Sequence, residues 1–431
     1  MKITFLGGAR EVGRSAFLLE EEKSRVLLDY GVNIEEEEIP KAFPIPFKGY
    51  VDSVVLSHGH LDHSGAIPLL YRDSEPLTVM TPPSVPIVEL LIKDSLKIAD
   101  INDKYLPFSE NELKRMMRRV SSLKYEKQKR VSDGVNVKLH DAGHIIGSSM
   151  PELDFKGRKI LYTGDFNLRQ TRLHDPAFAD FKQGDIDVLI TESTYADRIH
   201  PDRKELEKEF VQSCLDVLDA GGNVLVPAFA LGRAQEVLMI LDAYDVPYPV
   251  YLDGMAKSIA DIMLSYPEYV RDPDALQKAL LDAKWVKHPS TRRKVFNEPS
   301  IVVSPAGMMQ GGHVVSYMTS LLKKSTNPAV FLTGYQVPGT PGNVLLEEKR
   351  FSVDNININC SGVNVKYFDF SAHADQADLH EMVKLTSPKL VIVVHGDPDK
   401  APVLKQWVED EVGIPALLPS VGDVIEVDRY I

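Results

Sequence analysis

Short apolar segments that end in Gly, Ser or Asp recur along the chain, and several are followed by amphipathic segments of helical period. The segment LGRAQEVLMILDAYD at 231–245 is one of these predicted helices. The alternation of strand and helix predicts an α/β fold, in which functional groups gather where strands end. The predicted buried strands lie at 51–57, 158–165, 187–193, 223–228, 300–307, 329–335 and 389–397.

Residues suited to metal binding follow the first of these strands, in the stretch LSHGHLDHSG. His58, His60, Asp62 and His63 are too closely spaced for one helix face, where ligands recur every three or four residues. On a loop leaving a strand, His58 can converge with His60, and Asp62 with His63. Imidazole and carboxylate without thiolate suit Zn²⁺ and comparable transition ions. Two such pairs predict a dinuclear centre, and a histidine-rich loop without metal is the alternative.

Three further candidate ligands follow other predicted strands. They are His144 in HDAGHIIGS, Asp165 in LYTGDFN and His395 in VVHGD. Asp165 can bridge two ions, while His144 completes the first site and His395 the second. The histidines without such a context are expected to be surface or packing residues, and they are His140, His174, His200, His288, His313 and His380.

The motifs HGHLDHSG, AGHIIGS, TGDFN and LLDYG resemble the ordered motifs of the metallo-β-lactamase superfamily. This resemblance implies an αββα sandwich with two zinc ions per chain. It also implies that Asp29, in LLDYG, orders a ligand or the nucleophilic water. Asp165 and His395 are too far apart in the chain for a single loop to join them, so an inserted domain is expected between them.

The inserted part resembles the β-CASP domain of RNA and DNA nucleases. The similar motifs are TEST with Glu192, SAHAD with His373, VVHGD with His395, and the stretches PAFALGRAQE, SPAGMMQGG and GYQVPGT. They look most like the endonuclease subunit of the cleavage-and-polyadenylation machinery and its archaeal relatives. Because DNA-specific members usually lack a histidine matching His395, the resemblance implies an RNA substrate.

The resemblance also predicts where the domains begin and end. The metallo-β-lactamase domain is expected at 1–196 and 359–431, the β-CASP domain at 197–358, and the site in the cleft between them. Archaeal relatives often carry N-terminal KH domains, and RNase J relatives carry a C-terminal domain. The sequence shows neither, which predicts a two-domain version of the family.

The expected activity is that of a zinc-dependent ribonuclease in RNA processing or decay, such as mRNA 3′-end processing. Two zinc ions would activate water as hydroxide, and in-line attack would leave a 5′-phosphate and a 3′-hydroxyl. His373 is the candidate general acid, because histidine titrates near neutral pH. Glu192 is expected to orient His373 and favour its protonated form, and a buried pair that only braces the two domains is the alternative. Endonuclease and 5′-to-3′ exonuclease modes both stay open.

RNA contacts outside the metals are expected from two motifs. Arg233 follows FALG at a predicted helix start, where a guanidinium can hold a phosphate, although a surface salt bridge is the alternative. Ser304 and Gly307 in SPAGMM are expected to let the backbone approach RNA closely. The resemblance further suggests a homodimer.

The composition limits these hypotheses. A formal net charge of −13 argues against a general nucleic-acid binder, but the stretches 114–130 and 284–294 are locally basic. Either stretch can instead be a solvated face. The two cysteines, Cys214 and Cys360, cannot form a disulfide framework, which favours a reducing cytoplasm. No apolar run is long enough for a membrane helix.

Three other functions are compatible with part of the sequence. Another metallo-β-lactamase hydrolase, such as a glyoxalase II-like thioesterase or a lactonase, would explain the ligands but not the long insertion. A flavodiiron oxidoreductase would have an acidic residue where His60 stands. An inactive RNA-binding subunit would have lost ligands, whereas all seven candidates are present.

Overall fold

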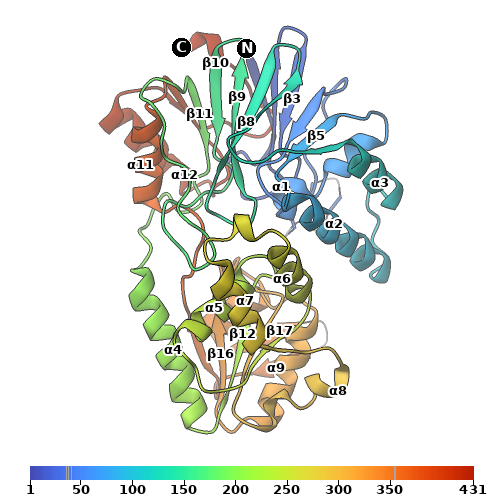
Figure 1. Cartoon of the computed structure of the whole chain (residues 1–431), viewed down its shortest axis with the longest axis vertical. Coiled ribbons are helices and arrows are strands. Elements are labelled where there is room, and N and C mark those ends of the chain that lie inside the picture. The colour runs from blue at the N-terminus through green and yellow to red at the C-terminus, as the bar shows by residue number, and fades with distance from the viewer. Residues whose placement is uncertain (35, 37, 40, 354–355) are drawn as a thin grey trace. The chain divides into compact units, whose positions relative to one another are not determined.

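The computed structural model describes residues 1–34, 36, 38–39, 41–353 and 356–431, which form two compact units (Figure 1). The first unit consists of Met1–Gln170, Asp175–Ile199 and Ala372–Ile431. The second consists of Thr171–His174 and His200–Ser371. The sequence-based boundary after 358 differs from the end of the second unit, because β19 (Asn364–Tyr367) pairs with β16 (Pro328–Leu332) inside that unit.

The first unit contains two seven-stranded sheets. In sheet order, the first sheet consists of β22 (Val424–Glu426), β1 (Lys2–Gly7), β2 (Ala16–Glu21), β3 (Ser24–Leu28), β4 (Ser53–Val55), β5 (Leu77–Met80) and β6 (Val120–Ser122). The second consists of β21 (Ala416–Leu417), β20 (Leu390–Val393), β11 (Val188–Thr191), β10 (Arg158–Tyr162), β9 (Ser149–Phe155), β8 (Val135–Asp141) and β7 (Gln128–Ser132). Strands β3 to β6 are mutually parallel, as are β10, β11, β20 and β21.

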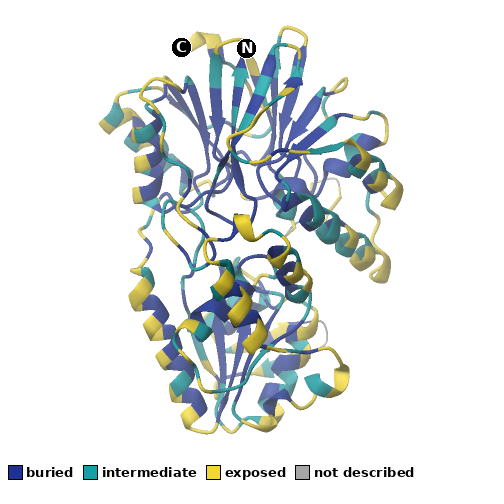
Figure 2. Ribbon diagram, in the orientation of Figure 1, coloured by how far each residue is buried: buried dark blue, intermediate teal, exposed yellow. Residues whose placement is uncertain are grey.

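The central strands of the first sheet, β2 to β5, are mostly buried on both faces, whereas the edge strands β22 and β6 are partly exposed (Figure 2). Phe17 of β2 points to the second sheet and packs edge-to-face on Tyr162 of β10, with ring centroids 5.4 Å apart. The next residue, Leu18, points the other way, toward the helices α2 (Ser84–Ile101) and α3 (Glu110–Arg119). Helices α11 (Gln376–Thr386) and α12 (Ala401–Trp407) cover the outer face of the second sheet. The predicted αββα sandwich is confirmed.

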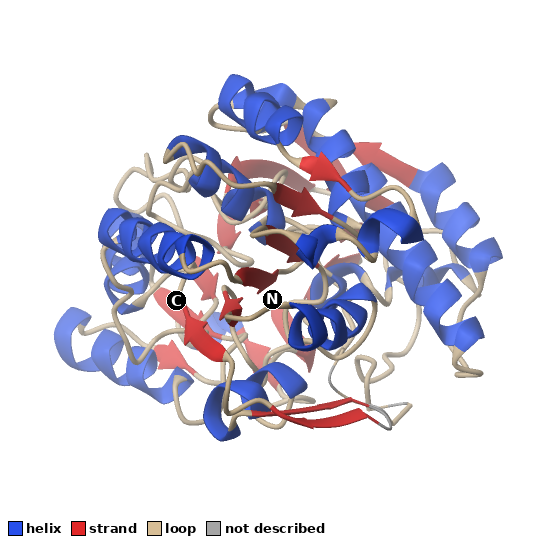
Figure 3. Ribbon diagram, turned by 90° about the horizontal axis from the view of Figure 1, so that it is seen from below, coloured by secondary structure: helices blue, strands red, loops and turns tan. Residues whose placement is uncertain are grey.

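The second unit contains a parallel sheet with helices on both faces (Figure 3). Its strands, in sheet order, are β14 (Lys284–Trp285), β13 (Val250–Leu252), β15 (Ile301–Ser304), β12 (Asn223–Pro227), β16 and β19. Helix α9 (His313–Lys324) packs on one face, whereas Phe210 of α4 (Arg203–Asp219) packs against Phe331 on the other. The other α-helices and strands of this unit are α5 (Arg233–Ala243), α6 (Ala256–Leu264), α7 (Pro273–Asp282), α8 (Pro289–Arg292), α10 (Pro341–Glu348), β17 (Arg350–Val353) and β18 (Ile356–Asn359).

The predicted α/β class and the inserted domain are therefore both present. Within the described part of the chain, no helix has the length and apolar composition needed to cross a membrane.

Candidate metal centre

The histidine cluster begins where β4 ends and continues into a helix of a single turn. His58 and His60 lie on the connection, and Asp62 and His63 belong to α1 (Leu61–Ser64). The sequence predicted a loop throughout. The helical turn forms because the amide of Ser64 donates to the carbonyl of His60 at 2.9 Å. This turn places Asp62 and His63 beside each other, with His63 Nε2 3.7 Å from Asp62 Oδ2.

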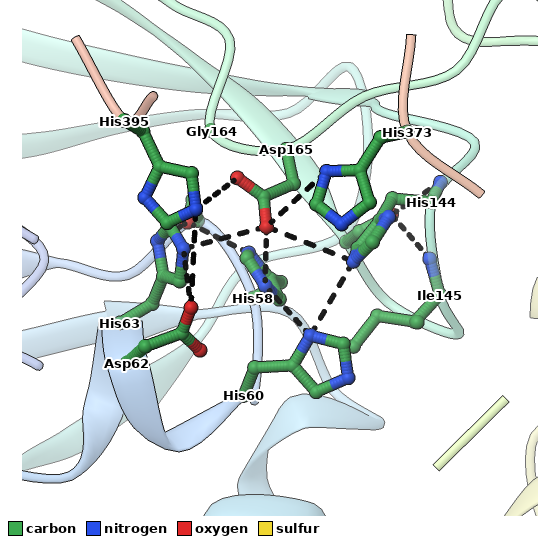
Figure 4. Close-up of polar contacts among 12 residues, drawn as sticks. His58, His60, Asp62, His63, His144, Ile145, Gly164, Asp165, His373 and His395 are labelled. Atoms are coloured by element: carbon green, nitrogen blue, oxygen red, sulfur yellow. Dashed lines mark hydrogen bonds and ion pairs between the residues drawn. The ribbon is translucent and has the colours of Figure 1, made fainter. Parts of the chain in front are cut away.

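The structure brings all seven predicted ligands into two groups that share Asp165 (Figure 4). Within each group the potential ligand atoms all lie within 4.8 Å of one another. The first group comprises His58, His60, His144 and Asp165, and the second comprises Asp62, His63, Asp165 and His395. These are the same two sets that the sequence predicted.

Asp165 lies between the groups and presents one oxygen to both. Its Oδ2 lies 3.5 Å from His58 Nε2 in the first group and 3.4 Å from His63 Nε2 in the second. Its Oδ1 lies 3.6 Å from His395 Nε2. A carboxylate whose oxygens face both groups in this way can bridge two ions.

The ring nitrogens that face away from the centre are hydrogen-bonded, which orients the rings. His63 Nδ1 donates to Asp29 Oδ2 at 2.7 Å, and His144 Nδ1 donates to the carbonyl of Ala372 at 2.8 Å. His58 Nδ1 lies 3.1 Å from Ser57 Oγ. These bonds leave Nε2 of each ring as the potential ligand. His60 is the exception, since its Nδ1 faces the centre at 3.1 Å from His58 Nε2.

Asp29 lies in a buried hydrogen-bond network behind the ligands. Besides His63, it accepts bonds from the amide and the hydroxyl of Ser57, each at 2.7 Å, and from the Tyr162 hydroxyl at 2.8 Å. Asp29 thus contacts His63, one of the predicted ligands, and its role in ordering a ligand stays a prediction. Ser57 and Tyr162 were not predicted. Ser57 adjoins the cluster, but no local pattern distinguishes Tyr162 from an ordinary strand residue.

The residues present fit a metal ion of the zinc type. His63 Nε2 and Asp165 Oδ1 are buried, and neither has a hydrogen-bond partner among the described residues. A buried polar atom without a hydrogen-bond partner costs free energy unless a ligand such as a metal ion binds it. The surrounding donors are imidazole nitrogens and carboxylate oxygens, the set that zinc accepts.

Electrostatics prepare these side chains as ligands. Burial lowers the pKa values of His58 and His144 well below 6.5, and the pKa of His60 to about 4, so these imidazoles stay neutral. Burial also acts against protonation of His63, but Asp165 and Asp62 outweigh it and raise the pKa of His63 well above 6.5. The carboxylates around His63 therefore favour a positive charge at this position. A bound metal cation would supply that charge.

His373 and Glu192 form a pair beside the two groups. His373 Nδ1 lies 3.0 Å from Glu192 Oε2 and 3.9 Å from Asp165 Oδ2. Burial lowers the pKa of His373, but the carboxylates of Glu192 and Asp165 outweigh burial and raise this pKa to about 9. Glu192 is itself held by the amide of Phe166 at 2.9 Å and by the hydroxyl of Thr194 at 2.6 Å. Sequence reasoning missed Thr194, although it lies in the TEST motif.

The predicted RNA contacts lie in the second unit. Arg233 is the first residue of α5, and its charge helps Arg203 to lower the pKa of Glu236 against the opposing effect of burial. Ser304 ends β15 and is fully buried, with its hydroxyl donating to the carbonyl of Pro305 at 3.0 Å. Gly307 lies close to Phe229, whose amide nitrogen would be 3.2 Å from an added Cβ.

Three family models match the chain. They are a metallo-beta-lactamase superfamily domain at residues 18–194, a Beta-Casp domain at 234–345, and a Zn-dependent metallo-hydrolase RNA specificity domain at 356–419. A solved protein of unknown function from Enterococcus faecalis V583 shares the fold, with a TM-score of 0.61 and 15% identity over 98% of this chain and 99% of its own.

Curated relatives match along nearly the whole chain. Probable RNase MJ4 of Methanocaldococcus jannaschii is 38% identical over 99% of this chain and 100% of its own length. RNase aCSPSF2 of Saccharolobus solfataricus is also 38% identical, over 99% of this chain and 85% of its own. Transcription termination factor FttA of Pyrococcus abyssi is 33% identical over 99% of this chain and 71% of its own length. The resemblance inferred from the motifs is confirmed, and the chain belongs to the β-CASP family of metallo-β-lactamase-fold ribonucleases.

Proposed function

We propose that this ribonuclease uses two zinc ions to hydrolyse RNA phosphodiesters, in RNA processing or decay. The convergence of six imidazole and carboxylate side chains around Asp165, the residue common to both groups, supports this proposal most directly. His58, His60, His144 and Asp165 would hold one ion, and Asp62, His63, Asp165 and His395 the other. Two zinc ions bound there would supply a nucleophilic water near neutral pH and positive charge for the scissile phosphate.

The chain's own residues would control the proton at the leaving oxygen. Hydrolysis adds the water oxygen to phosphorus and breaks the bond to the 3′-oxygen, which then needs a proton. His373 would donate it as general acid, because its ring lies beside the ligands and the neighbouring carboxylates favour its protonated form. Glu192 would hold the ring through Nδ1 and leave Nε2 to donate. The products would carry a 5′-phosphate and a 3′-hydroxyl.

The proposal also covers the RNA contacts, the oligomeric state and the cellular compartment. Arg233 would contact a phosphate, and the backbone at Ser304 and Gly307 would lie close to RNA. A homodimer is part of the proposal on family grounds. A reducing cytoplasm is also part of it, since Cys214 and Cys360 are both buried free thiols.

Metal analysis and product mapping test the function together. The purified protein should contain two zinc ions per chain, measured by elemental analysis. On 5′-labelled RNAs that begin with triphosphate, monophosphate or hydroxyl, it should release fragments with a 5′-phosphate. Stepwise shortening from a 5′-monophosphate end would identify the exonuclease mode, and discrete internal products the endonuclease mode. A protein that binds RNA but holds no zinc would instead be an inactive subunit, and a 2′,3′-cyclic phosphate product would contradict the mechanism.

A further inference from the structure

Ser15 contacts the metal centre although it lies in none of the metal-binding motifs. It is fully buried just before β2, and its hydroxyl oxygen lies 2.9 Å from Nδ1 of His395, which is 380 residues away in the sequence. The other nitrogen of this ring, Nε2, faces the second group of ligands, 3.9 Å from Asp62 Oδ2. Ser15 is therefore the side chain that meets the outer nitrogen of His395.

The direction of this hydrogen bond follows from the chemistry of the ring. An imidazole that binds a metal through Nε2 is neutral and carries its hydrogen on Nδ1. His395 therefore donates to Ser15 Oγ, which accepts. Such a bond fixes the tautomer and the orientation of the ring and makes Nε2 a better ligand.

The backbone around Ser15 also holds the second group of ligands. The amide of Ser15 donates to the carbonyl of Asp62 at 2.9 Å, and the amide of His395 donates to the carbonyl of Gly8 at 2.7 Å. The connection from β1 to β2 thus contacts two ligands of the second group. His395 needs this support, because its φ of 45° lies in the left-handed region, which is unfavourable for a residue with a Cβ.

The first group of ligands is held by other residues. His58 Nδ1 faces Ser57, and His144 Nδ1 donates to the carbonyl of Ala372. Asp165 alone is common to both groups. A change at Ser15 should therefore weaken one site and spare the other.

We propose that Ser15 is a positioning residue for the second metal site and that its hydroxyl sustains the affinity of that site through His395. The inference rests on the proposed two-zinc function. It assigns a role to a residue from the N-terminal connection, and it predicts that the two sites respond differently to one substitution.

Zinc titration of the metal-free protein against a chromophoric chelator tests the inference. In Ser15→Ala the first ion should bind as in the parent, and the second should bind about 10–100-fold more weakly. Ser15→Thr keeps the hydroxyl and should recover most of the loss. Ser24→Ala is the matched control, because Ser24 is also buried and donates to the carbonyl of Asp133, away from the centre.

The outcomes separate this inference from the proposed function. If the parent binds no zinc, the proposed function fails. If the parent binds two ions and Ser15→Ala binds both with unchanged affinity, or weakens both equally, only the role of Ser15 is overturned. Should Ser15→Ala not fold, Ser15→Cys decides, because the thiol keeps the volume but accepts hydrogen bonds weakly. Parent-like binding of both ions in that variant would likewise overturn the inference.

Discussion

His373 shows how single side chains acquire a chemical role from their neighbours. Burial alone would keep this imidazole neutral, as it does His144, whose ring centroid lies 4.5 Å away. The carboxylate of Glu192 reverses that preference for His373 and raises its pKa to about 9. Two adjacent histidines thus differ in charge, which suits one to be a ligand and the other to be an acid.

Replacing His373 by alanine separates these two roles. His373 forms a third group of potential ligands with Asp165 and Glu192 but belongs to neither of the two four-residue sets proposed to hold zinc. His373→Ala should therefore keep both zinc ions and should lower the cleavage rate about 10²–10⁴-fold. Single-turnover cleavage and zinc content measured on the same sample check this. His380→Ala is the control, because His380 stacks on Trp407 away from the ligands and its loss should leave the rate unchanged. A His373→Ala protein that fails to fold would favour a bracing role for the pair.

In the second unit, Asp253 is a buried charged residue whose pKa is also shifted by its neighbours. It follows β13 and accepts hydrogen bonds from Arg292 at 2.7 Å, Tyr317 at 2.8 Å and Lys257 at 3.0 Å. Burial acts to raise its pKa, but the bond from Arg292, then one from the amide of Gly254, and then those from Lys257 and Tyr317 lower the pKa to about 2. The ionised form therefore stabilises the folded state at every pH above the ordinary carboxyl value of about 3.9.

Asp253→Asn should lower the free energy of unfolding by about 1–3 kcal/mol at pH 7, because charged hydrogen bonds are lost. The difference from the parent should shrink as the pH falls from about 4 toward 2, since the parent carboxylate then becomes protonated. Denaturant unfolding at several pH values measures it. Asp261→Asn, an exposed position on α6, should match the parent throughout. Equal stability of Asp253→Asn and the parent at pH 7 would show that these bonds contribute nothing net.

At the scale of elements, α1 is held in place by the segment that follows β3. Tyr30 and Val32 donate backbone hydrogen bonds to the carbonyls of His63 and Leu61 at 2.8 and 2.9 Å. Gly31, between them, lies so close that an added Cβ would be 1.7 Å from the carbonyl oxygen of Asp62. Only glycine permits this approach, and the approach sets the position of Asp62 and His63, two of the proposed ligands.

Gly31→Ala should therefore displace α1 and weaken the second zinc site. We expect a lower zinc content and a lower Tm, because the overlap is with backbone atoms that cannot rotate away. Zinc analysis and thermal unfolding measure both effects. Gly362→Ala is the control, since nothing lies within 4 Å of a Cβ added there. If Gly31→Ala retained two ions and the parent Tm, the close approach would not determine the site.

On the scale of the whole molecule, the charge of −13 opposes a polyanionic substrate. Binding must therefore depend on local cations, of which Arg233 is the one proposed at a helix start. Its position at the beginning of α5 suits a phosphate, because the helix N-terminus carries partial positive charge. RNA affinity should consequently fall steeply with added salt.

Arg233→Ala should weaken RNA binding at matched salt for all sequences alike, and should reduce the slope of log K against log salt by about 1. Fluorescence anisotropy with labelled RNA in a chelator, which prevents cleavage, measures both quantities. Lys208→Ala on α4 is the control, because Lys208 pairs with Glu205 on an exposed helix face. Unchanged affinity in Arg233→Ala would remove this residue from the RNA-binding surface.

Local pattern in the sequence was sufficient for the α/β class and, with the family resemblance, for the choice of the seven candidate ligands, which stay a prediction as metal ligands. Asp165 and His395 each end an apolar run, and the parallel strands β10, β11 and β20 bring these ends to the same edge of the sheet. His144 instead follows β8, whose residues alternate in burial and which pairs antiparallel with β7 and β9. The tight spacing around His58 and His60 needed no long-range information, because the ligands are neighbours in the chain.

Tertiary structure alone decided which ring nitrogen faces the centre and what holds it there. Ser15 contacts His395, which is 380 residues away in the sequence, and Tyr162 contacts Asp29, which is 133 residues away. No periodicity in the sequence predicts either contact. The turn at α1 and the close approach of Gly31 likewise depend on hydrogen bonds between separate segments. Sequence patterns record which residues are buried and how they alternate, whereas the partner of a buried polar atom is set only when distant segments pack together.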